Sequence, residues 1–292
     1  MSIINKLRER IRTIGILEDR VHKIQEALGR IEARQLAAQG SKNLVENEFR
    51  VFSQWGEDGI IQYLVSAVNI DRKIFIEFGV QNYTESNTRF LLINNNWSGL
   101  IIDSDQAHID YIRSDPLYWQ YNLKSEKAFI TCENINALIS AAGIQGEVGL
   151  LSIDIDGNDY WVWKAIEVIS PVIVIVEYNA RFGVDAAVTV PYDPGFIREH
   201  AHPSRLYFGA SLKALFLLGE EKGYAFVGCN SAGNNAFFVR RDRMPDSVPS
   251  LSVSEGFVRH QYRESRDALG QLTFDSPDVE AMPKSLPLVQ VG

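Results

Sequence analysis

Short apolar runs alternate with amphipathic stretches through the middle of the chain, between residues 46 and 242. Apolar runs closed by polar residues or glycine are typical of buried parallel strands, and a spacing of three and four residues is typical of amphipathic helices. Alternating strands and helices indicate βαβ units in a parallel sheet. The pattern predicts strands at 73–79, 99–103, 128–131, 149–154 and 171–177, and helices at 60–68, 86–95, 106–114, 134–142 and 160–168.

The alternation ends near residue 180. Residues 181–210 contain no long periodic element, and a loop of this length in a compact domain is usually functional or disordered. Its aromatic residues and histidines favour function, so we expect it to shape a binding pocket. After it, the pattern predicts a helix and an antiparallel hairpin. Residues 243–292 are predicted to form a partly ordered C-terminal extension. The predicted elements of this part are a helix at 209–222, strands at 224–229 and 235–240, and a helix near 255–269.

Residues 1–40 carry a different pattern, an apolar seam with steps of three and four residues and one stammer near Gly15. The stretch predicts a long amphipathic helix that either self-associates as a coiled coil or packs on the globular part; the seam favours a coiled coil and a homo-oligomer. Acidic and basic residues are mixed, which disfavours a membrane-surface helix. The seam consists of Ile4, Leu7, Ile11, Ile14, Leu17, Val21, Ile24, Leu28 and Ile31.

Composition narrows the class of protein. The chain has 292 residues, 46% of them hydrophobic, enough for one large domain with appendages. Its net charge of −8 argues against a general nucleic-acid binder, which needs a basic face. Two cysteines, Cys132 and Cys229, give neither a disulfide framework nor a zinc-site spacing. With no apolar leader and no run long enough to cross a bilayer, we expect a cytoplasmic protein.

The first chemical signal lies at the ends of the first two predicted strands. One strand ends in Glu77-Phe78-Gly79, and the next ends in Asp103, 24 residues after Gly79. A glycine there lets a ligand approach the backbone, and an acid ending the second strand can bind the two hydroxyls of a ribose. The glycine-rich pyrophosphate loop is absent, which favours a nucleoside ligand without phosphates. Alternatively, Glu77 and Asp103 bond to loop amides.

The second signal is a group of oxygen ligands after two later strands. Asp154 and Asp156 follow one strand, and Glu177 and Asn179 follow the next. Adjacent strand ends lie roughly 5 Å apart, so these side chains can converge. Oxygen-rich sites suit Mg²⁺ or Ca²⁺. In the alternative interpretation, these acids cap helices and bind loop amides.

Two further groups of residues have both a chemical and a structural interpretation. His200 and His202, in the long loop, can supply a general base, because imidazole titrates near neutrality. Loop histidines are also commonly solvent-exposed and inert. Asn158 and Asp159 follow the Asp156-Gly157 turn and can cap the next helix.

Several motifs together resemble one family. FIEFG, ESNTRFLL, NNWSGLIID, LLSIDIDGNDYWVW and IVIVEYN, preceded by SQWGED, resemble class I S-adenosylmethionine-dependent methyltransferases, and most closely their FkbM-like branch. The resemblance covers about residues 52–240. It implies a Rossmann-like α/β fold whose seven-stranded, mostly parallel sheet ends in an antiparallel hairpin. It also implies methyl transfer from S-adenosylmethionine to a hydroxyl of a sugar or surface-glycan precursor.

The resemblance also assigns roles to residues. Glu77 and Gly79 are implied to lie beside the methionine part of the cofactor, Asp103 at the ribose and Asp154 next to the methyl group. The oxygen ligands after the two later strands resemble the Mg²⁺ site of metal-dependent O-methyltransferases. The chain departs from the family in its first loop, GVQNY, which is not glycine-rich. The other residues implied to bind the cofactor are Gln54, Asn87, Thr131 and Asn134.

A different class of function remains open. The same fold can serve as a non-catalytic binding or assembly subunit that is oligomerised by the N-terminal helix, because a fold does not determine a function.

Overall fold

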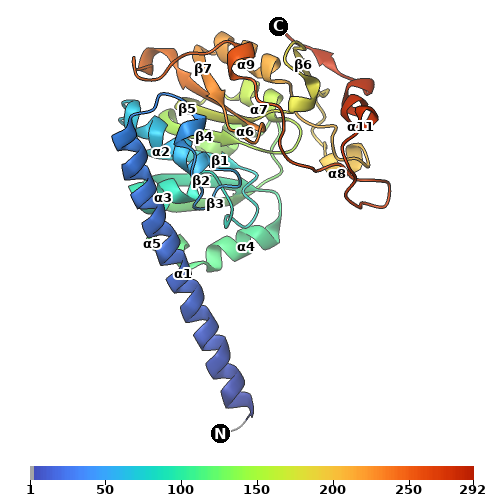
Figure 1. The fold of residues 1–292 in the computed structure, drawn as a ribbon. Coiled ribbons are helices and arrows are strands. Elements are labelled where there is room, and N and C mark those ends of the chain that lie inside the picture. The colour runs from blue at the N-terminus through green and yellow to red at the C-terminus, as the bar shows by residue number, and fades with distance from the viewer. Residues whose placement is uncertain (1–2) are drawn as a thin grey trace.

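A seven-stranded sheet forms the centre of the computed structural model, which describes residues 3–292 (Figure 1). The strand order is β3-β2-β1-β4-β5-β8-β7; the first five strands are parallel, and β8 runs antiparallel to both β5 and β7. The predicted Rossmann-like sheet with its terminal hairpin is therefore confirmed. The strands are β1 Ile74–Phe78, β2 Ser98–Asp103, β3 Leu123–Lys127, β4 Gly146–Ile153, β5 Ile169–Glu177, β7 Tyr224–Cys229 and β8 Asn235–Arg240.

Helices cover both faces of the sheet, because successive strand residues point to opposite faces and both sets are apolar. In β1, Phe75 packs with α2 to α5, whereas Ile76 and Phe78 pack with α6, α7 and α9. The central strands are thus buried on both sides. The helices are α2 Glu57–Ala67, α3 Arg89–Asn95, α4 Gln106–Ser114, α5 Pro116–Gln120, α6 Ile135–Ala141, α7 Asp159–Ala165, α8 Arg198–Ala201 and α9 Leu212–Glu221.

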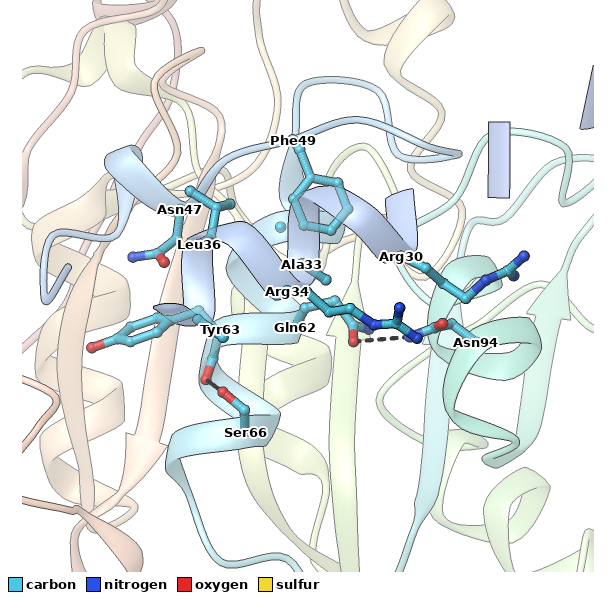
Figure 2. Close-up of a pocket in the computed structure, with 12 residues that line it drawn as sticks. Arg30, Ala33, Arg34, Leu36, Asn47, Phe49, Gln62, Tyr63, Ser66 and Asn94 are labelled. Carbon is cyan, nitrogen blue, oxygen red and sulfur yellow. Dashed lines mark hydrogen bonds between the residues drawn. The ribbon is translucent and has the colours of Figure 1, made fainter. Parts of the chain in front are cut away.

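The N-terminal helix α1, Ile3–Gln39, is continuous through Gly15, and its first half extends away from the domain (Figure 1). Its second half packs on the domain through small residues. Gly29 lies so close to Val51 and Phe90 that an added Cβ would come within 2.4 Å of Val51. Figure 2 shows Ala33 and Leu36 of α1 beside Tyr63 of α2, around a cavity of about 310 Å³.

The apolar seam of α1 is on a different face from this contact. Its described side chains from Ile14 to Ile31 are 49–60% exposed, so within the described part of the chain the seam has no packing partner. The side chains of Ile4, Leu7 and Ile11 lie outside the described ones. The predicted helix is confirmed, and the packing on the domain does not use the seam. Among residues 3–292, no helix combines the length and hydropathy of a bilayer span.

Two predicted elements are wrong. The third strand is at Leu123–Lys127 and not at 128–131. It is an edge strand in which buried Leu123 and Ser125 alternate with charged residues, so it lacks an apolar run. The predicted helix at 255–269 is only the four-residue α10, Val253–Gly256. Gly256 packs against Phe226 with no room for a Cβ, and the chain continues from there without a helix.

The C-terminal extension is tied to the domain at several points. Its last strand, β9 Val289–Gln290, pairs with β6 Val188–Thr189, which lies in the long loop. Arg181 in that loop has a side chain only 1% exposed, and it forms ion pairs with three acids of the extension. The extension, with its short helix α11 Pro277–Ala281, therefore lies against the long loop (Figure 1). These acids are Glu264, Asp275 and Glu280.

Candidate active site

The register of the sheet brings four predicted site residues into one row. Ile102 of β2, Phe78 of β1, Ile153 of β4 and Val176 of β5 are consecutive partners across the sheet. The residues that follow them are Asp103, Gly79, Asp154 and Glu177. In open α/β sheets, ligands bind outside the carboxyl ends of strands, where the strand order reverses; here that point lies between β1 and β4.

Gly79 is at the centre of the row, where no side chain fits. Its φ is +72°, and an added Cβ would lie 1.7 Å from the carbonyl oxygen of Asp154. Left-handed backbone geometry favours glycine, and the contact excludes every other residue. This close approach joins the ends of β1 and β4 beneath two cavities.

The first cavity, of about 450 Å³, lies at the ends of β1, β2 and β4, and we call it the β2-side cavity. Asp103 and His108 contribute polar groups, and Phe129, which is 44% exposed, contributes an aromatic face. Its other lining residues include Gly79, Gln81, Ile102, Ala128, Ile130, Asp154 and Phe196. The cavity is also lined by Ser104, Asp105, Asp156, Asn158 and Glu199, so polar and charged side chains predominate in its wall, and its apolar part lies around Phe129.

Asp103 organises this cavity. Its Oδ2 accepts a hydrogen bond from the Gln81 amide (2.7 Å), and its Oδ1 accepts one from the Asp105 amide (2.9 Å). Nδ1 of His108 also lies 3.0 Å from Oδ1. Three partners leave lone pairs free on a carboxylate that lines the cavity. Asp103 therefore bonds to loop amides, as the alternative interpretation has it, and keeps lone pairs that can accept hydroxyls.

The second cavity, of about 470 Å³, lies beside the ends of β4 and β5, and we call it the β5-side cavity. It shares five lining residues with the first, among them Gly79, Gln81 and Asp154. The long loop contributes Arg198, and the C-terminal extension contributes Tyr262 and other residues. The remaining lining residues include Gln54, Trp55, Asp156, Glu177, Glu199, Arg205, Arg263, Glu264 and Arg266. The prediction that the long loop shapes a pocket is confirmed.

Three carboxylates converge between the cavities. One oxygen each from Asp154, Asp159 and Glu177 lies within 4.8 Å of the others. Both oxygens of Asp159 accept loop amides, from Ile155 at 2.8 Å and Gly157 at 2.9 Å. Glu177, only 6% exposed, has an Oε2 atom without a hydrogen-bond partner in the described chain. Asp154 also accepts no hydrogen bond from the described residues.

Burial raises the pKa values of these acids, and their mutual repulsion raises them further. Loss of hydration is the main cause, and it raises the pKa of Asp159 to about 6. The pKa of Asp154 is raised well above its usual range by burial and then by the charges of Asp156 and Asp159. The pKa of Glu177 is raised well above its usual range by burial and then by the charge of Asp154. Such shifts are typical of functional sites.

Arg198 supplies the nearest positive charge. Its guanidinium forms an ion pair with Asp156 at 2.5 Å and another with Glu264, and it stacks on the Phe208 ring at 3.6 Å. Its field partly counteracts the raised pKa of Asp154 and of Glu177. Asp156, predicted as a metal ligand, is exposed and paired with Arg198, so it lies outside the converging group.

Glu77 has the structural role that the sequence left open. Its Oε1 accepts the Asn87 amide at 2.8 Å, and its Oε2 accepts the Thr88 amide at 3.0 Å and the Thr88 hydroxyl. Burial nevertheless raises the pKa of Glu77 to about 7. Asn87, in turn, donates to Ser152 at 3.1 Å. The two residues hold the loop after β1, at a small cavity of about 90 Å³ that they line together with Gln54.

Three other predicted site residues have different roles. Asn179 donates to the carbonyls of Leu206 (2.9 Å) and Phe208 (3.1 Å), and its Oδ1 accepts the Arg181 amide. Its side chain is therefore used by the loop, and these contacts give no support to its prediction as a metal ligand. Thr131 and Asn134 bond to each other at the start of α6 and do not line the β2-side cavity. Phe129, and neither of these two residues, lines the β2-side cavity.

The predicted histidines do not line either cavity. His200 is exposed on α8, and His202 bonds to Ser204 at 2.8 Å. Their neighbours Arg198 and Glu199 line the β5-side cavity instead. The histidine that does line a cavity is His108, which the sequence analysis missed. Its signal was its position five residues after Asp103, at the start of a helix that follows the strand end.

Backbone strain gathers at the same place. Gln81, Asp156 and Arg205 have positive φ values, of 49°, 57° and 59°, and all three line the β5-side cavity. Left-handed geometry at non-glycine residues costs of order 1–3 kcal/mol each and is concentrated at functional sites. The strain supports this edge of the sheet as the active site.

No protein-family model matches the chain, and no curated protein matches it. Solved structures do. A candidate caffeoyl-CoA O-methyltransferase from Staphylococcus aureus is 15% identical, with 75% of this chain and 98% of that one covered and a TM-score of 0.44. A candidate O-methyltransferase from Klebsiella pneumoniae is 13% identical, with 74% of this chain and 97% of that one covered and a TM-score of 0.42. An O-methyltransferase from Bacillus cereus in complex with SAH is 14% identical, with 71% of this chain and 88% of that one covered and a TM-score of 0.41. At such low identities, the activity of this chain has to be argued from its own residues.

Proposed function

We propose that the protein transfers a methyl group from S-adenosylmethionine to a hydroxyl of a small acceptor. The observation that carries this proposal is the pair of cavities joined at Gly79, Gln81 and Asp154. The β2-side cavity combines Asp103 with the exposed ring of Phe129, the β5-side cavity is lined by four arginines, and Asp154 lies where the two meet. The motifs that resemble FkbM-like methyltransferases support a sugar or surface-glycan precursor as the acceptor.

The residues of the β2-side cavity fit the proposed cofactor. Asp103 offers carboxylate lone pairs for the two ribose hydroxyls, and Phe129 offers an exposed ring for the base. Gly79 leaves the backbone open to close approach. Glu77 and Asn87 act behind these groups by holding the loop that follows β1. When bound, S-adenosylmethionine supplies an electrophilic methyl group on a positively charged sulfur.

Asp154 is proposed as the group that takes the proton from the acceptor hydroxyl. It lies where the two cavities meet, and its side chain accepts no hydrogen bond from the described residues. A raised pKa makes its carboxylate a stronger base than an ordinary aspartate. Glu177 in the next strand lies close enough to share the proton. Asp154 would then hold the proton of the acceptor hydroxyl while the bond from oxygen to the methyl carbon forms and the bond from sulfur to that carbon breaks, with S-adenosylhomocysteine as the leaving group.

A divalent cation fits the same carboxylates. Asp154 and Glu177 have oxygens without protein donors, and Asp159 adds a third carboxylate within 4.8 Å. All-oxygen donor sets suit Mg²⁺. Bound there, the ion would lower the pKa of an acceptor hydroxyl and neutralise the repulsion among the acids. We propose Mg²⁺ at this position, with Asp154 and Glu177 as its protein ligands, as the alternative to Asp154 acting as the base. With the ion bound, its charge would activate the acceptor hydroxyl, and without it the Asp154 carboxylate would take the proton.

Calorimetric titration with S-adenosylhomocysteine tests the cofactor proposal. Asp103→Ala should weaken binding by about 1.5–3 kcal/mol, the usual effect of losing a charge-assisted hydrogen bond. Asp110→Ala on the exposed face of α4 is the matched control and should leave the affinity unchanged. If the protein does not bind the ligand at millimolar concentration, the non-catalytic alternative is favoured. Equal affinities of Asp103→Ala and the wild type would remove Asp103 from the ribose.

We also propose that α1 joins a second copy of the chain through its seam. Six aliphatic side chains from Ile14 to Ile31 stay about half exposed, while the domain is contacted by the face that carries Gly29 and Ala33. A heptad seam of this kind is buried in coiled coils. The free cysteines, Cys132 and Cys229, suit the cytoplasmic location that we propose for the assembly.

Charged substitutions in the seam test the proposed assembly. Leu17→Lys/Ile24→Lys should lower the molar mass in solution to that of one chain, because two buried charges oppose pairing of the seams. Light scattering gives the mass. His22→Lys adds a charge to an exposed position off the seam and should keep the wild-type mass. If the double variant and the wild type have the same mass per particle, the seam has another role.

A further inference from the structure

We propose that the acceptor carries an oxyanion, a phosphate or a carboxylate, which Arg205, Arg263 and Arg266 bind in the β5-side cavity. This rests on the proposed function, which makes that cavity the acceptor site. The inference adds to the proposed function the chemical class of the acceptor and the direction in which the acceptor binds.

The guanidinium groups of these arginines are largely unpaired. Four arginines line the cavity, and Arg198 is committed to Asp156 and Glu264. Arg205 lies 3.6 Å from Glu199, a loose contact. None of the ion pairs in the described part of the chain involves Arg263 or Arg266, which contact the Phe274 ring and the Gly270 carbonyl instead. Each guanidinium has five N–H donors, so many donors in this cavity remain free for a ligand.

The two arginines of the extension are held in position. The backbone around them folds back on itself: Arg266 pairs with Leu272, and the Thr273 amide donates to the Ser265 carbonyl at 2.8 Å. Arg263 stacks on the Phe274 ring at 4.7 Å, and Arg266 donates to the Gly270 carbonyl at 2.8 Å. The ion pairs of Arg181 fasten the same segment to the long loop. Donors that are ordered before binding lose less entropy when a ligand arrives.

Charge determines the orientation of such an acceptor. Asp154 and Glu177 would repel an anion at the strand ends, whereas Arg263 and Arg266 attract one from the extension. An anionic acceptor is therefore bound with its charged end at the arginines and a hydroxyl at Asp154. In the same cavity, Trp55 stacks on Tyr262 with 5.2 Å between ring centroids, and the pair offers an aromatic surface to a sugar ring. The arginine fork matches the oxygens of phosphate and carboxylate.

Calorimetry on the full chain, with S-adenosylhomocysteine present and absent, tests the proposal with three probes: glucose, glucose 6-phosphate and glucuronate. The charged probes should bind at least about tenfold more tightly than glucose, the effect of one charge-assisted contact. Arg263→Ala/Arg266→Ala should abolish the difference. Arg241→Ala, an exposed arginine paired with Glu220 outside the cavity, should preserve it. A preference between the two charged probes identifies phosphate or carboxylate as the anion.

Three results would overturn the proposal: equal affinity for glucose and both charged probes, unchanged anion affinity in the double variant, or no binding of either charged probe at millimolar concentration. The affinity for S-adenosylhomocysteine separates this failure from failure of the proposed function. The double variant should keep the wild-type affinity for that ligand, because neither arginine lines the β2-side cavity. Its unfolding curve shows whether it is folded.

Discussion

The strand end of β1 and the strand ends of β4 and β5 all carry acids with little exposure, yet their surroundings differ. Glu77 and Glu177 are buried, and Asp154 is half-buried. Glu77, after β1, accepts three hydrogen bonds from the loop that leads into α3. Asp154 and Glu177, after β4 and β5, accept none from the described residues, and an oxygen of Glu177 is buried without a partner. All three have a raised pKa, with burial as the first cause.

The difference separates structural acids from chemical ones. A buried carboxylate with amide donors on both oxygens stabilises a loop, and its removal leaves those donors unpaired. A buried carboxylate without donors destabilises the fold unless a ligand, a cation or a proton joins it. A raised pKa by itself does not distinguish the two, whereas the hydrogen-bond partners do. The fold thus bears an energetic cost at Asp154 and Glu177 that a bound ligand can offset.

The largest expected effect concerns turnover. Asp154→Asn should lower kcat about 10²- to 10⁴-fold, the usual contribution of a positioned base, while the affinity for S-adenosylhomocysteine stays near the wild-type value. Methyl-transfer assays against a panel of sugar phosphates and uronates provide the measurement. Glu177→Gln should behave similarly. Wild-type activity that survives exhaustive chelation would rule out the cation, and full activity of Asp154→Asn would rule out this residue as the base.

The next largest effect is on the stability of the fold and concerns Glu77, after β1. Glu77→Ala should lower the free energy of unfolding by about 3 kcal/mol, because the amides of Asn87 and Thr88 lose their acceptor in a buried loop. Urea denaturation gives the value. Glu85→Ala removes a half-exposed acid paired with Arg50 in the same loop, and we expect a change within about 0.5 kcal/mol. Similar values for the two variants would contradict a structural role for Glu77.

The sequence predicted the central part of the fold and the row of strand-end residues, because both depend on local pattern. Buried parallel strands are nearly continuous apolar runs, so the ends of β1, β2, β4 and β5 could be located, and Asp103, Asp154 and Glu177 with them. Strand β3 was misplaced because an edge strand alternates buried and charged residues. Its apolar neighbours, around Phe129, line a cavity instead.

The parts of the site that were missed depend on chain segments far apart in the sequence. The side-chain amide of Asn179 donates hydrogen bonds to carbonyls 27 and 29 residues later in the chain. The residue pattern at a strand end does not reveal such contacts. Asp159 was expected as a helix cap, and it does bond to its own turn, but the turn also brings it to Glu177. The arginines of the extension reach the cavity only because the chain returns there after β8. When a segment far away in the sequence contributes residues to a site, no local pattern of apolar and polar residues indicates it.

The smallest expected effect is a pH dependence of stability, which tests whether the charged form of Asp154 is disfavoured in the folded protein. Its folded-state pKa is raised, whereas the unfolded chain has an ordinary value near 3.9. Between these two values the folded protein holds more protons than the unfolded one, so this group makes stability fall as pH rises. An asparagine has no proton to lose. Asp154→Asn should therefore be more stable than the wild type at pH 8.

The gain of Asp154→Asn should shrink as the pH is lowered toward the unfolded-state pKa, where both side chains are neutral. Urea denaturation in EDTA at a series of pH values measures it, because chelation removes any cation that would mask the repulsion. Asp110→Asn, on the exposed face of α4, should follow the wild-type curve at every pH. A difference between Asp154→Asn and the wild type that stays constant with pH would mean that Asp154 ionises freely in the folded protein. The contrast with Glu77 would then rest on hydrogen bonds alone, and a base of ordinary strength would have to perform the proton transfer.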